Sequence, residues 1–255
     1  MSAVRVEFPL ESPLFEGHFP GHPILPGIAH LAIIERALGQ SLAAVRSLKL
    51  RRPVLPGDAL DLVLSDPEGD RWTRFELRRN QEVVSSGAVA SNQGGSGREE
   101  GVATHSGAPE PSPDFPSVET LLPHAPPARL VRSIAEASPE EIVCAAEIPP
   151  LHPLASGKRS PAFLGIEAGA QAAAVLEALN RRRETPGPRI GYLVGIREAR
   201  FAVPHLLAGW PLRVAARLQG SAPPLSIYEI AVGEPGREAV TGTVSTFLAM
   251  PTRDG

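Results

Sequence analysis

A run of 26 residues from Ser91 to Pro116, SNQGGSGREEGVATHSGAPEPSPDFP, divides the chain. Gly, Ser, Pro and charged residues dominate it and it shows no apolar periodicity, which is typical of a flexible connector. Fully extended, it would span about 85 Å, enough to join two domains almost anywhere on their surfaces. The sequence therefore predicts a first domain at residues 1–92, a linker at 93–115 and a second domain at 116–255.

The halves on either side of this run repeat the same order of elements. Each has a proline that ends an extended segment and starts an apolar helix, because proline is favoured in the first turn of a helix. Pro26 precedes GIAHLAIIERAL, and Pro161 precedes AFLGIEAGAQAAAVLEAL. Extended patterns follow in each half, at residues 48–64 and 83–90, and at residues 197–218 and 239–250. This order predicts a duplicated α+β unit, in which an antiparallel sheet packs on one long helix.

Charge and composition exclude several classes of function. A net charge of −3 argues against non-specific nucleic-acid binding. The N-terminus has no apolar signal core and the most apolar segment carries two Glu, so we expect a soluble cytoplasmic protein with no membrane partner. The single cysteine, Cys144, excludes an internal disulfide, and its apolar run EIVCAAEI predicts a buried strand residue. No Cys/His spacing resembles a zinc site, so no metal is expected.

Two motifs in the first half resemble a known family. The loop HFPGHPILPG at residues 18–27, with the helix after it, and LKLRRPVLPGDAL at 48–60 resemble the β-hydroxyacyl-(acyl carrier protein) dehydratases of the hot-dog fold. Residues 113–251 resemble the same superfamily, through LLPHAPPARLV at 121–131 and the helix segment PAFLGIEAGAQAAA. The second half is more similar to the dehydratase-like partner proteins of polyene-type assembly lines. The resemblance implies a double hot-dog: two antiparallel sheets, each wrapping a central helix, paired as a pseudo-dimer.

The resemblance also implies where the active site lies. In that family the His of the HFPG loop comes from one subunit and an acid on the central helix comes from the other, fourteen positions after the motif His. Counting from His18 gives Ala32, so the first half lacks its acid. Ala32 lies six positions after Pro26, and the same spacing from Pro161 gives Glu167.

The second half has the acid but lacks the histidine loop. It has no HFPG loop, and its nearest substitute, LHPLASGKRSP, places His152 nine residues before Pro161, where the family spacing is eight. The two defects are complementary. One intact composite site, His18 with Glu167, and one decayed site, His152 with Ala32, are therefore expected.

The expected reaction is loss of water from a 3-hydroxyacyl thioester. Imidazole has an ordinary pKa near 6.5, which suits the base, and a carboxyl on an apolar helix has a raised pKa, which suits the acid. How His18 and Glu167 divide the two protons is left open; the resemblance favours His as base and Glu as acid or water holder. Gly27 and Pro26 are expected to form the oxyanion and substrate site with Phe19, since the N–H of Gly27 lies at a helix N-terminus. The elimination requires no cofactor.

The substrate handle is expected to be an acyl carrier protein or coenzyme A. The cluster Lys49, Arg51 and Arg52 could dock an acidic carrier, although such residues on an exposed strand are often only solvated. Two rival functions remain: a hot-dog acyl thioesterase, and a non-catalytic acyl-binding or partner subunit. Further association of pseudo-dimers is left open.

The remaining polar residues receive structural interpretations. His22 is expected to be a loop residue, and His30 a satisfied core histidine with an accessory catalytic role as the alternative. Glu35 is expected to face solvent beside Arg36, unless it supplies the acid for a second site with His152. Three more residues lie outside any expected site: His124 and His205 in Pro-flanked loops, and Gln171 as a hydrogen bonder of the helix.

Overall fold

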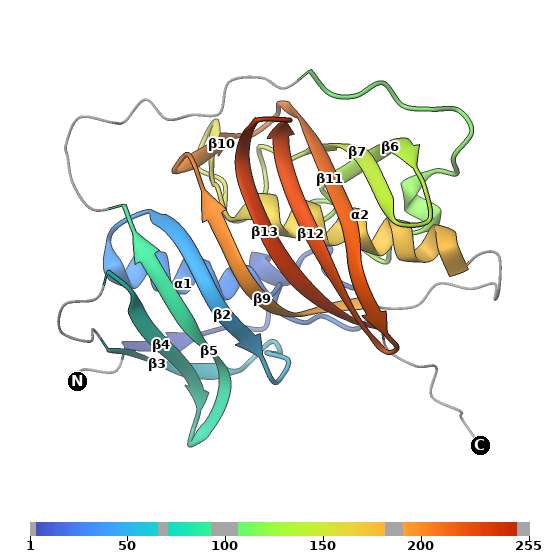
Figure 1. The fold of residues 1–255 in the computed structure, drawn as a ribbon. Coiled ribbons are helices and arrows are strands. Elements are labelled where there is room, and N and C mark those ends of the chain that lie inside the picture. The colour runs from blue at the N-terminus through green and yellow to red at the C-terminus, as the bar shows by residue number, and fades with distance from the viewer. Residues whose placement is uncertain (1–3, 66–70, 93–106, 182–190, 249–255) are drawn as a thin grey trace, which may run out of the picture.

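The computed structural model describes residues 4–65, 71–92, 107–181 and 191–248 (Figure 1). The elements of the first half are β1 (Val4–Glu7), η1 (Pro13–Phe15), α1 (Ala29–Leu38), β2 (Leu42–Leu50), β3 (Ala59–Ser65), β4 (Thr73–Arg79) and β5 (Glu82–Ser91). The elements of the second half are η2 (Val118–Thr120), β6 (Val131–Ala137), β7 (Glu141–Glu147), β8 (Arg159–Pro161), α2 (Leu164–Arg181), β9 (Gly191–Phe201), β10 (His205–Leu207), β11 (Pro211–Ala222), β12 (Leu225–Glu234) and β13 (Arg237–Leu248).

Eleven of the strands form one antiparallel sheet, in the order β1-β3-β4-β5-β2-β9-β13-β12-β11-β7-β6. The halves meet where β2 pairs with β9, with Val45 opposite Ala199 and Leu48 opposite Ile196. The prediction of one separate sheet per half is therefore wrong in this detail. Without this pair, β2 and β9 would each be an edge strand with unpaired backbone groups, and pairing removes both edges.

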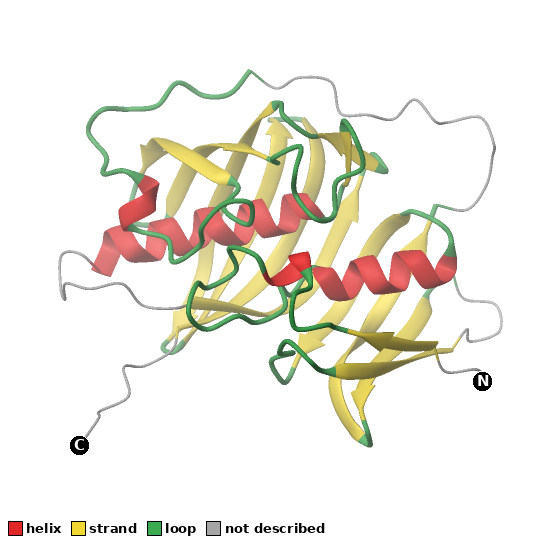
Figure 2. Cartoon of the chain, turned by 180° about the vertical axis from the view of Figure 1, so that it is seen from behind, coloured by secondary structure: helices red, strands yellow, loops and turns green. Residues whose placement is uncertain are grey.

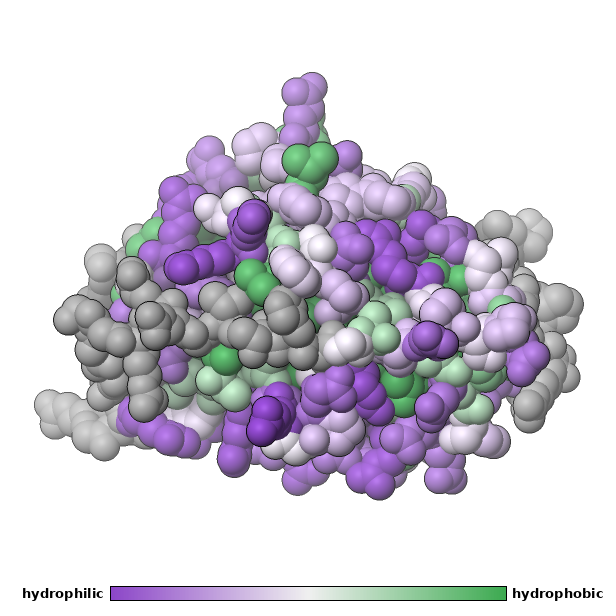
Figure 3. Space-filling model, turned by 90° about the horizontal axis from the view of Figure 1, so that it is seen from above, coloured by the Kyte–Doolittle hydropathy of each residue, from purple (hydrophilic) through white to green (hydrophobic). Residues whose placement is uncertain are grey.

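Both helices pack on the same face of the sheet, as the view from behind shows (Figure 2). α1 buries Leu31 and Ile34, three residues apart and so on one side of the helix. α2 buries eleven of its residues. Buried side chains from both halves form a single hydrophobic core. On the face seen from above, hydrophilic residues dominate and hydrophobic ones appear only in small separate patches (Figure 3).

Three expectations about local structure need adjustment. Each helix begins three residues after its proline, α1 at Ala29 and α2 at Leu164, so neither proline lies in the first helical turn. The extended patterns at 48–64 and 197–218 are each interrupted, because a loop after β2 separates it from β3, and β9 ends before Pro204. Proline lacks the N–H that an interior strand needs for its ladder. The final strands of the halves, β5 and β13, and the burial of Cys144 on β7 are confirmed.

The structure describes only residues 107–115 of the predicted linker. Residues 93–106 of the predicted segment lie outside the described residues. From residue 107 onward the chain runs along the second half, where the N–H of Ser112 donates to the carbonyl of Ile134 and the side chain of Phe115 packs on the core. Within the described ranges, no helix has the length and apolarity needed to cross a membrane.

Candidate active site

The loop after η1 places His18 with its imidazole buried. Its Nδ1 lies 2.8 Å from the carbonyl oxygen of Ile24. A carbonyl can only accept, so Nδ1 carries the proton in the neutral ring and Nε2 carries the free lone pair. Burial lowers the pKa of His18 to about 4. The ring is therefore neutral at pH 7, with Nε2 able to accept a proton.

Glu167 lies in the first turn of α2 and is buried. Burial raises the pKa of its carboxyl, and a hydrogen bond from Gln171 partly opposes that rise. Nε2 of Gln171 donates to Oε1 of Glu167 at 3.0 Å and to the carbonyl of Ala128 at 2.8 Å. The backbone N–H groups of Leu130 and Val131 donate to the side-chain oxygen of Gln171. Gln171 is thus a structural hydrogen bonder, as expected, and it also fixes the carboxyl.

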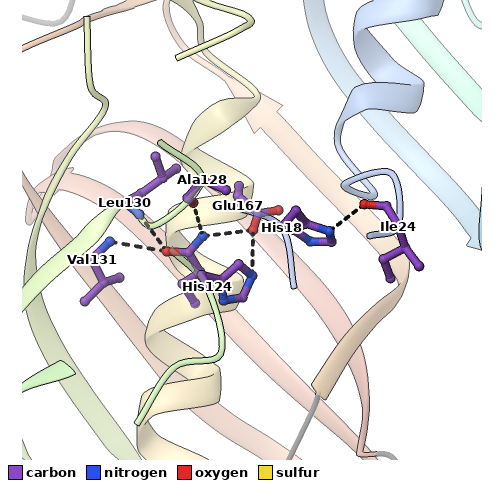
Figure 4. Close-up of polar contacts among 8 residues, drawn as sticks. His18, Ile24, His124, Ala128, Leu130, Val131 and Glu167 are labelled. Carbon is purple, nitrogen blue, oxygen red and sulfur yellow. Dashed lines mark hydrogen bonds and ion pairs between the residues drawn. The ribbon is translucent and has the colours of Figure 1, made fainter. Parts of the chain in front are cut away.

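His124 approaches the same carboxyl, which the sequence does not predict. Its Nε2 lies 3.6 Å from Oε1 of Glu167, and its ring centroid lies 5.2 Å from that of His18. One ring nitrogen of His18, one of His124 and one carboxylate oxygen of Glu167 all lie within 4.8 Å of one another. Figure 4 shows His18 and His124 reaching Glu167 from separate segments. Two imidazoles and a carboxylate could also share a zinc ion, so the expectation of no metal stays a prediction.

A close backbone contact holds the two histidine loops together. The N–H of Ala125 donates to the carbonyl of Gly17 at 2.8 Å. Gly17 has a φ of +74°, and a Cβ built on it would lie 2.2 Å from the carbonyl oxygen of Ala125. Only glycine fits this approach. Because Gly17 precedes His18 and Ala125 follows His124, the contact fixes the two histidines side by side.

His18, His124 and Glu167 line a cavity of about 470 Å³ between the halves. From the first half, His18, Phe19, Gly27 and the segment 50–54 contribute to its wall. One face of α2 contributes the residues at helical spacing Glu167, Ala170, Gln171, Ala174 and Glu177, and β9 and β13 close the opposite side. The volume is in the usual range for a small-molecule site. Small alanines on α2 leave the space that a bound chain would need.

Comparison with known proteins decides the family. Residues 116–253, more than half of the chain, match the ApeP-like family model, described as ApeP dehydratase. The chain belongs to the ApeP-like dehydratase family. Residues 2–88 of the chain match a second model, ApeI-like, described as ApeI dehydratase. The resemblance of both halves to hot-dog dehydratases is confirmed.

Curated relatives match the chain over a shorter stretch. The 3-hydroxyacyl-[acyl-carrier-protein] dehydratase FabZ of Thermus thermophilus is 42% identical over 64 residues, which is 20% of this chain and 45% of the relative. FabZ of Geobacter metallireducens is 36% identical over 66 residues, with 20% and 44% covered. The chain therefore spans less than half the length of these relatives.

Solved structures support the fold of the chain. The dehydratase heterocomplex ApeI:P from Xenorhabdus doucetiae matches with a TM-score of 0.50 and 25% identity, over 54% of this chain and 94% of that chain. The dehydratase domain of PpsC from Mycobacterium tuberculosis matches with a TM-score of 0.66 and 15% identity, over 97% of this chain and 93% of that chain. Together with the large antiparallel sheet and two helices, these matches fit a double hot-dog.

The other residues expected to contact substrate are divided by the structure. Gly27 lines the cavity, and a Cβ on it would lie 2.6 Å from Cδ1 of Leu50. Phe19 also lines the cavity, with a φ of 63° and ring contacts to His18 and Tyr192. A non-glycine residue in this left-handed region is strained, which is common at functional sites. Pro26 is buried and is not among the residues that line the cavity.

The residues of the predicted basic cluster are divided between two pockets. Arg51 and Arg52 are exposed and line the cavity. Their guanidinium groups donate to the Ser86 hydroxyl and the Glu82 carboxylate, respectively. Lys49 is absent from the cavity lining and belongs to a neighbouring groove on the sheet. The other charged residues of that groove are Arg46, Arg51, Arg74, Glu76 and Arg78.

The residues of the second expected site, His152 and Ala32, make contacts that differ from those of His18 and Glu167. His152 is buried, and its Nδ1 accepts a hydrogen bond from the N–H of Leu154 at 3.2 Å. Ala32 is half-buried against the core. Glu35 does not simply face solvent as expected, because its Oε2 accepts from the N–H of Leu42 at 2.9 Å and burial raises its pKa. Its described contact is thus with its own half and not with His152.

The remaining histidines follow the expectations only in part. His22 is exposed in its loop, where its Nδ1 donates to the carbonyl of Gly21. His30 is buried and its Nδ1 lies 2.7 Å from the Ser85 hydroxyl, although it also lines the cavity. His205 is half-buried and lies in strand β10, paired with Pro161, so the prediction of a loop is wrong for it. His124 also departs from its interpretation as an isolated loop residue: no spacing pattern in the sequence relates it to Glu167, and the contact between its loop and Gly17 brings it to the site.

Proposed function

We propose that this chain dehydrates (3R)-3-hydroxyacyl thioesters to trans-2-enoyl thioesters, at one composite site shared by its two halves. The observation that carries the proposal is the approach of the His18 imidazole, whose Nε2 is unprotonated, to the buried carboxyl of Glu167 on the wall of one cavity. Loss of water from adjacent carbons needs a base and a proton donor facing the same substrate. The family and the curated relatives, which carry dehydratase names, support the same reaction.

His18 is the proposed base and Glu167 the proposed acid. Nε2 of His18 removes the proton from the carbon next to the thioester, and the carboxyl of Glu167 gives its proton to the β-hydroxyl, which leaves as water. Gly27 is proposed to donate its N–H to the thioester oxygen as negative charge develops there. The chain supplies every proton acceptor and donor in this step, so no cofactor is required.

The shifted pKa values suit these starting states. Burial keeps His18 neutral and favours the protonated form of Glu167. After the step, His18 is an imidazolium and Glu167 a carboxylate. Opposite charges attract strongly in a buried site, so each product charge compensates part of the burial penalty of the other.

The cavity is proposed to hold the acyl chain. Ala170 and Ala174 lie one helical turn apart on α2, and Leu193 and Phe247 line the facing wall. Aliphatic groups gain about 0.8 kcal/mol for each buried CH₂. A leucine in place of Ala174 is expected to shorten the longest acyl chain that the enzyme accepts.

The thioester handle is proposed to be an acyl carrier protein. Arg51 and Arg52 lie at the cavity, and the groove beside it carries four further cations and one carboxylate, that of Glu76. Such a surface favours an acidic partner by charge complementarity. The PpsC dehydratase domain was solved in complex with C12:1-CoA, so coenzyme A is the alternative handle.

The two halves are proposed to correspond to the partners of a heterocomplex. The models matched by residues 2–88 and 116–253 carry the names of the components of ApeI:P. We propose the domains 1–92 and 116–255 joined by the linker 93–115, so that one polypeptide contains both components.

The decisive experiment is the dehydration of a 3-hydroxyacyl carrier substrate and its coenzyme A analogue, with product identity determined by mass spectrometry. The wild type should form the enoyl thioester, and His18→Ala and Glu167→Ala should each lose about 10²- to 10⁴-fold in rate. His205→Ala, which lies outside the cavity lining, is the control. Release of free acid would instead identify a thioesterase, and binding without turnover an acyl-binding subunit. Wild-type rates in both variants would contradict the proposed roles.

A further inference from the structure

A second histidine contacts the proposed acid. His124 comes from the segment that precedes β6, and it is 7% exposed. Its Nε2 faces Oε1 of Glu167 at 3.6 Å, and its ring packs against Phe19 with centroids 4.9 Å apart. It lines the same cavity as His18 and Glu167. The proposed function assigns it no role.

The surroundings of His124 do not suit a residue that only fills space. Its Nδ1 is fully buried without a hydrogen-bond partner, a state that only three other side-chain atoms share among the described residues. A buried nitrogen without a partner destabilises the fold, and an apolar ring of similar size would avoid that penalty. Each such group in a native structure needs an explanation, and a catalytic role is one of those known.

The protonation of the ring follows from its burial and its neighbours. Burial, and to a lesser extent the charges of His18 and Arg129, lowers the pKa of His124 to about 3. The ring is therefore neutral, with one N–H and one lone pair. A proton on Nε2 would point at Oε1 of Glu167, and the unpartnered Nδ1 would then be a lone pair, which is easier to leave unpaired than an N–H.

We infer that His124 is a positioning residue for proton transfer by Glu167: its Nε2–H closes from 3.6 Å to form a hydrogen bond with Oε1 as the carboxyl ionises, and the proton stays on His124. Gln171 already donates to this oxygen at 3.0 Å. With Gln171 bound to Oε1 and Nε2 of His124 facing the same atom at 3.6 Å, the acidic proton of Glu167 is held on Oε2, where the substrate hydroxyl can receive it. This inference rests on the proposed dehydration.

The path of the protons explains how a hydrogen bond from His124 would aid the reaction. His18 takes the α-proton, the Oε2 proton of Glu167 goes to the hydroxyl, and the C–O bond breaks with its electron pair leaving as water. Glu167 is then a carboxylate, and the two donors on Oε1 stabilise the new charge. Transfer of the proton from His18 back to Glu167 restores the starting state. The 3.6 Å contact from His124 becomes a hydrogen bond only as the charge on Oε1 develops, so it stabilises the transition state more than the bound substrate.

The test compares variants that keep or remove the donor. His124→Phe keeps a ring against Phe19 but removes the N–H, and His124→Gln retains an amide N–H of similar reach. His124→Phe should lower kcat about 10- to 100-fold with little change in KM, and His124→Gln should retain more activity than His124→Phe. His22→Phe, in the exposed loop, is the matched control and should keep wild-type activity.

The pH profile separates this role from a structural one. Removing a donor to the ionised carboxyl raises the pKa of Glu167, so the alkaline limb of kcat should move to higher pH in His124→Phe. A purely structural role would lower activity without moving the limb. His124→Leu carries the same expectation should the phenylalanine variant not fold, and circular dichroism checks folding.

The outcomes distinguish the two proposals. If the wild type does not dehydrate the substrate, the proposed function fails. If the wild type is active and His18→Ala is inactive, but His124→Phe keeps the wild-type kcat and an unshifted limb, only the role of His124 is overturned.

Discussion

His18 and His152 are the two histidines that the duplicated halves place before their helices, and they differ in one hydrogen bond. Both are buried, and burial lowers the pKa of each to about 4. Nδ1 of His18 donates to a carbonyl, which leaves Nε2 unprotonated. Nδ1 of His152 accepts from the N–H of Leu154, so its Nε2 carries the proton. Burial and pKa are thus alike in both halves, whereas the backbone partner of the ring decides which nitrogen can act as a base.

Moving the carboxyl between the halves tests this contrast most severely. Glu167→Ala should lower kcat about 10²- to 10⁴-fold. Adding Ala32→Glu restores the acid at the matching position of α1 but should not restore activity, because the Nε2 of His152 already carries its proton. Initial rates of enoyl thioester formation measure the effect. Recovery of activity in the double variant would show that the tautomer of His152 is not limiting.

The contact between the two loops predicts the next largest effect. Gly17→Ala places a Cβ 2.2 Å from the Ala125 carbonyl oxygen, so the loop must move and His18 with it. A shift of about 1 Å can lower the rate about 100-fold. Gly21→Ala is the matched control, because Gly21 also has a positive φ, +86°, but its Cβ would meet nothing within 4 Å.

Steady-state rates and thermal melts of both glycine variants separate the two causes. Gly21→Ala should show only the backbone strain, about 1–2 kcal/mol, with most of its activity retained. Equal losses of activity in the two variants would mean that strain, and not the clash with Ala125, governs the site.

The pH dependence of kcat/KM tests which histidine is the base. The base must be neutral, and a pKa of about 4 for His18 keeps it neutral down to that pH. The acid limb should therefore lie near pH 4 and not near the ordinary value of 6.5. Since Glu167 must hold its proton, activity should fall on the alkaline side above its raised pKa. His152→Phe should leave the acid limb unchanged; a shift would assign the limb to the second half.

The smallest effect concerns the cavity mouth. Arg51 and Arg52 precede Pro53, whereas Ala202 and Val203 precede the matching Pro204. Arg51→Ala with Arg52→Ala should raise KM several-fold for a carrier-bound substrate, less at high salt, and leave a small thioester substrate unaffected. Arg237→Ala, exposed in the β12–β13 hairpin, is the control. An equal rise in KM for the small thioester would argue against carrier docking.

The sequence contained enough information for the duplicated fold and for the approach of His18 to Glu167. Both follow from local motifs and from counting along the chain, which survive divergence because loop and helix geometry fix them. The contact of His124 with Glu167 arises between segments 43 residues apart and depends on Gly17 in the other half. No periodic pattern records such a contact. The prediction that Glu35 faces solvent fails for a similar reason, since its partner is the backbone of Leu42 and not a side chain.

The pairing of β2 with β9 has a consequence for dilution. In a dimer whose subunits each supply part of a site, the aligned fraction falls as the protein becomes scarce. Here the two strands belong to one polypeptide, so the partner is present at the high effective concentration of a tethered group. The alignment of His18 with Glu167 is therefore a property of each molecule, and activity per molecule should not vary with protein concentration.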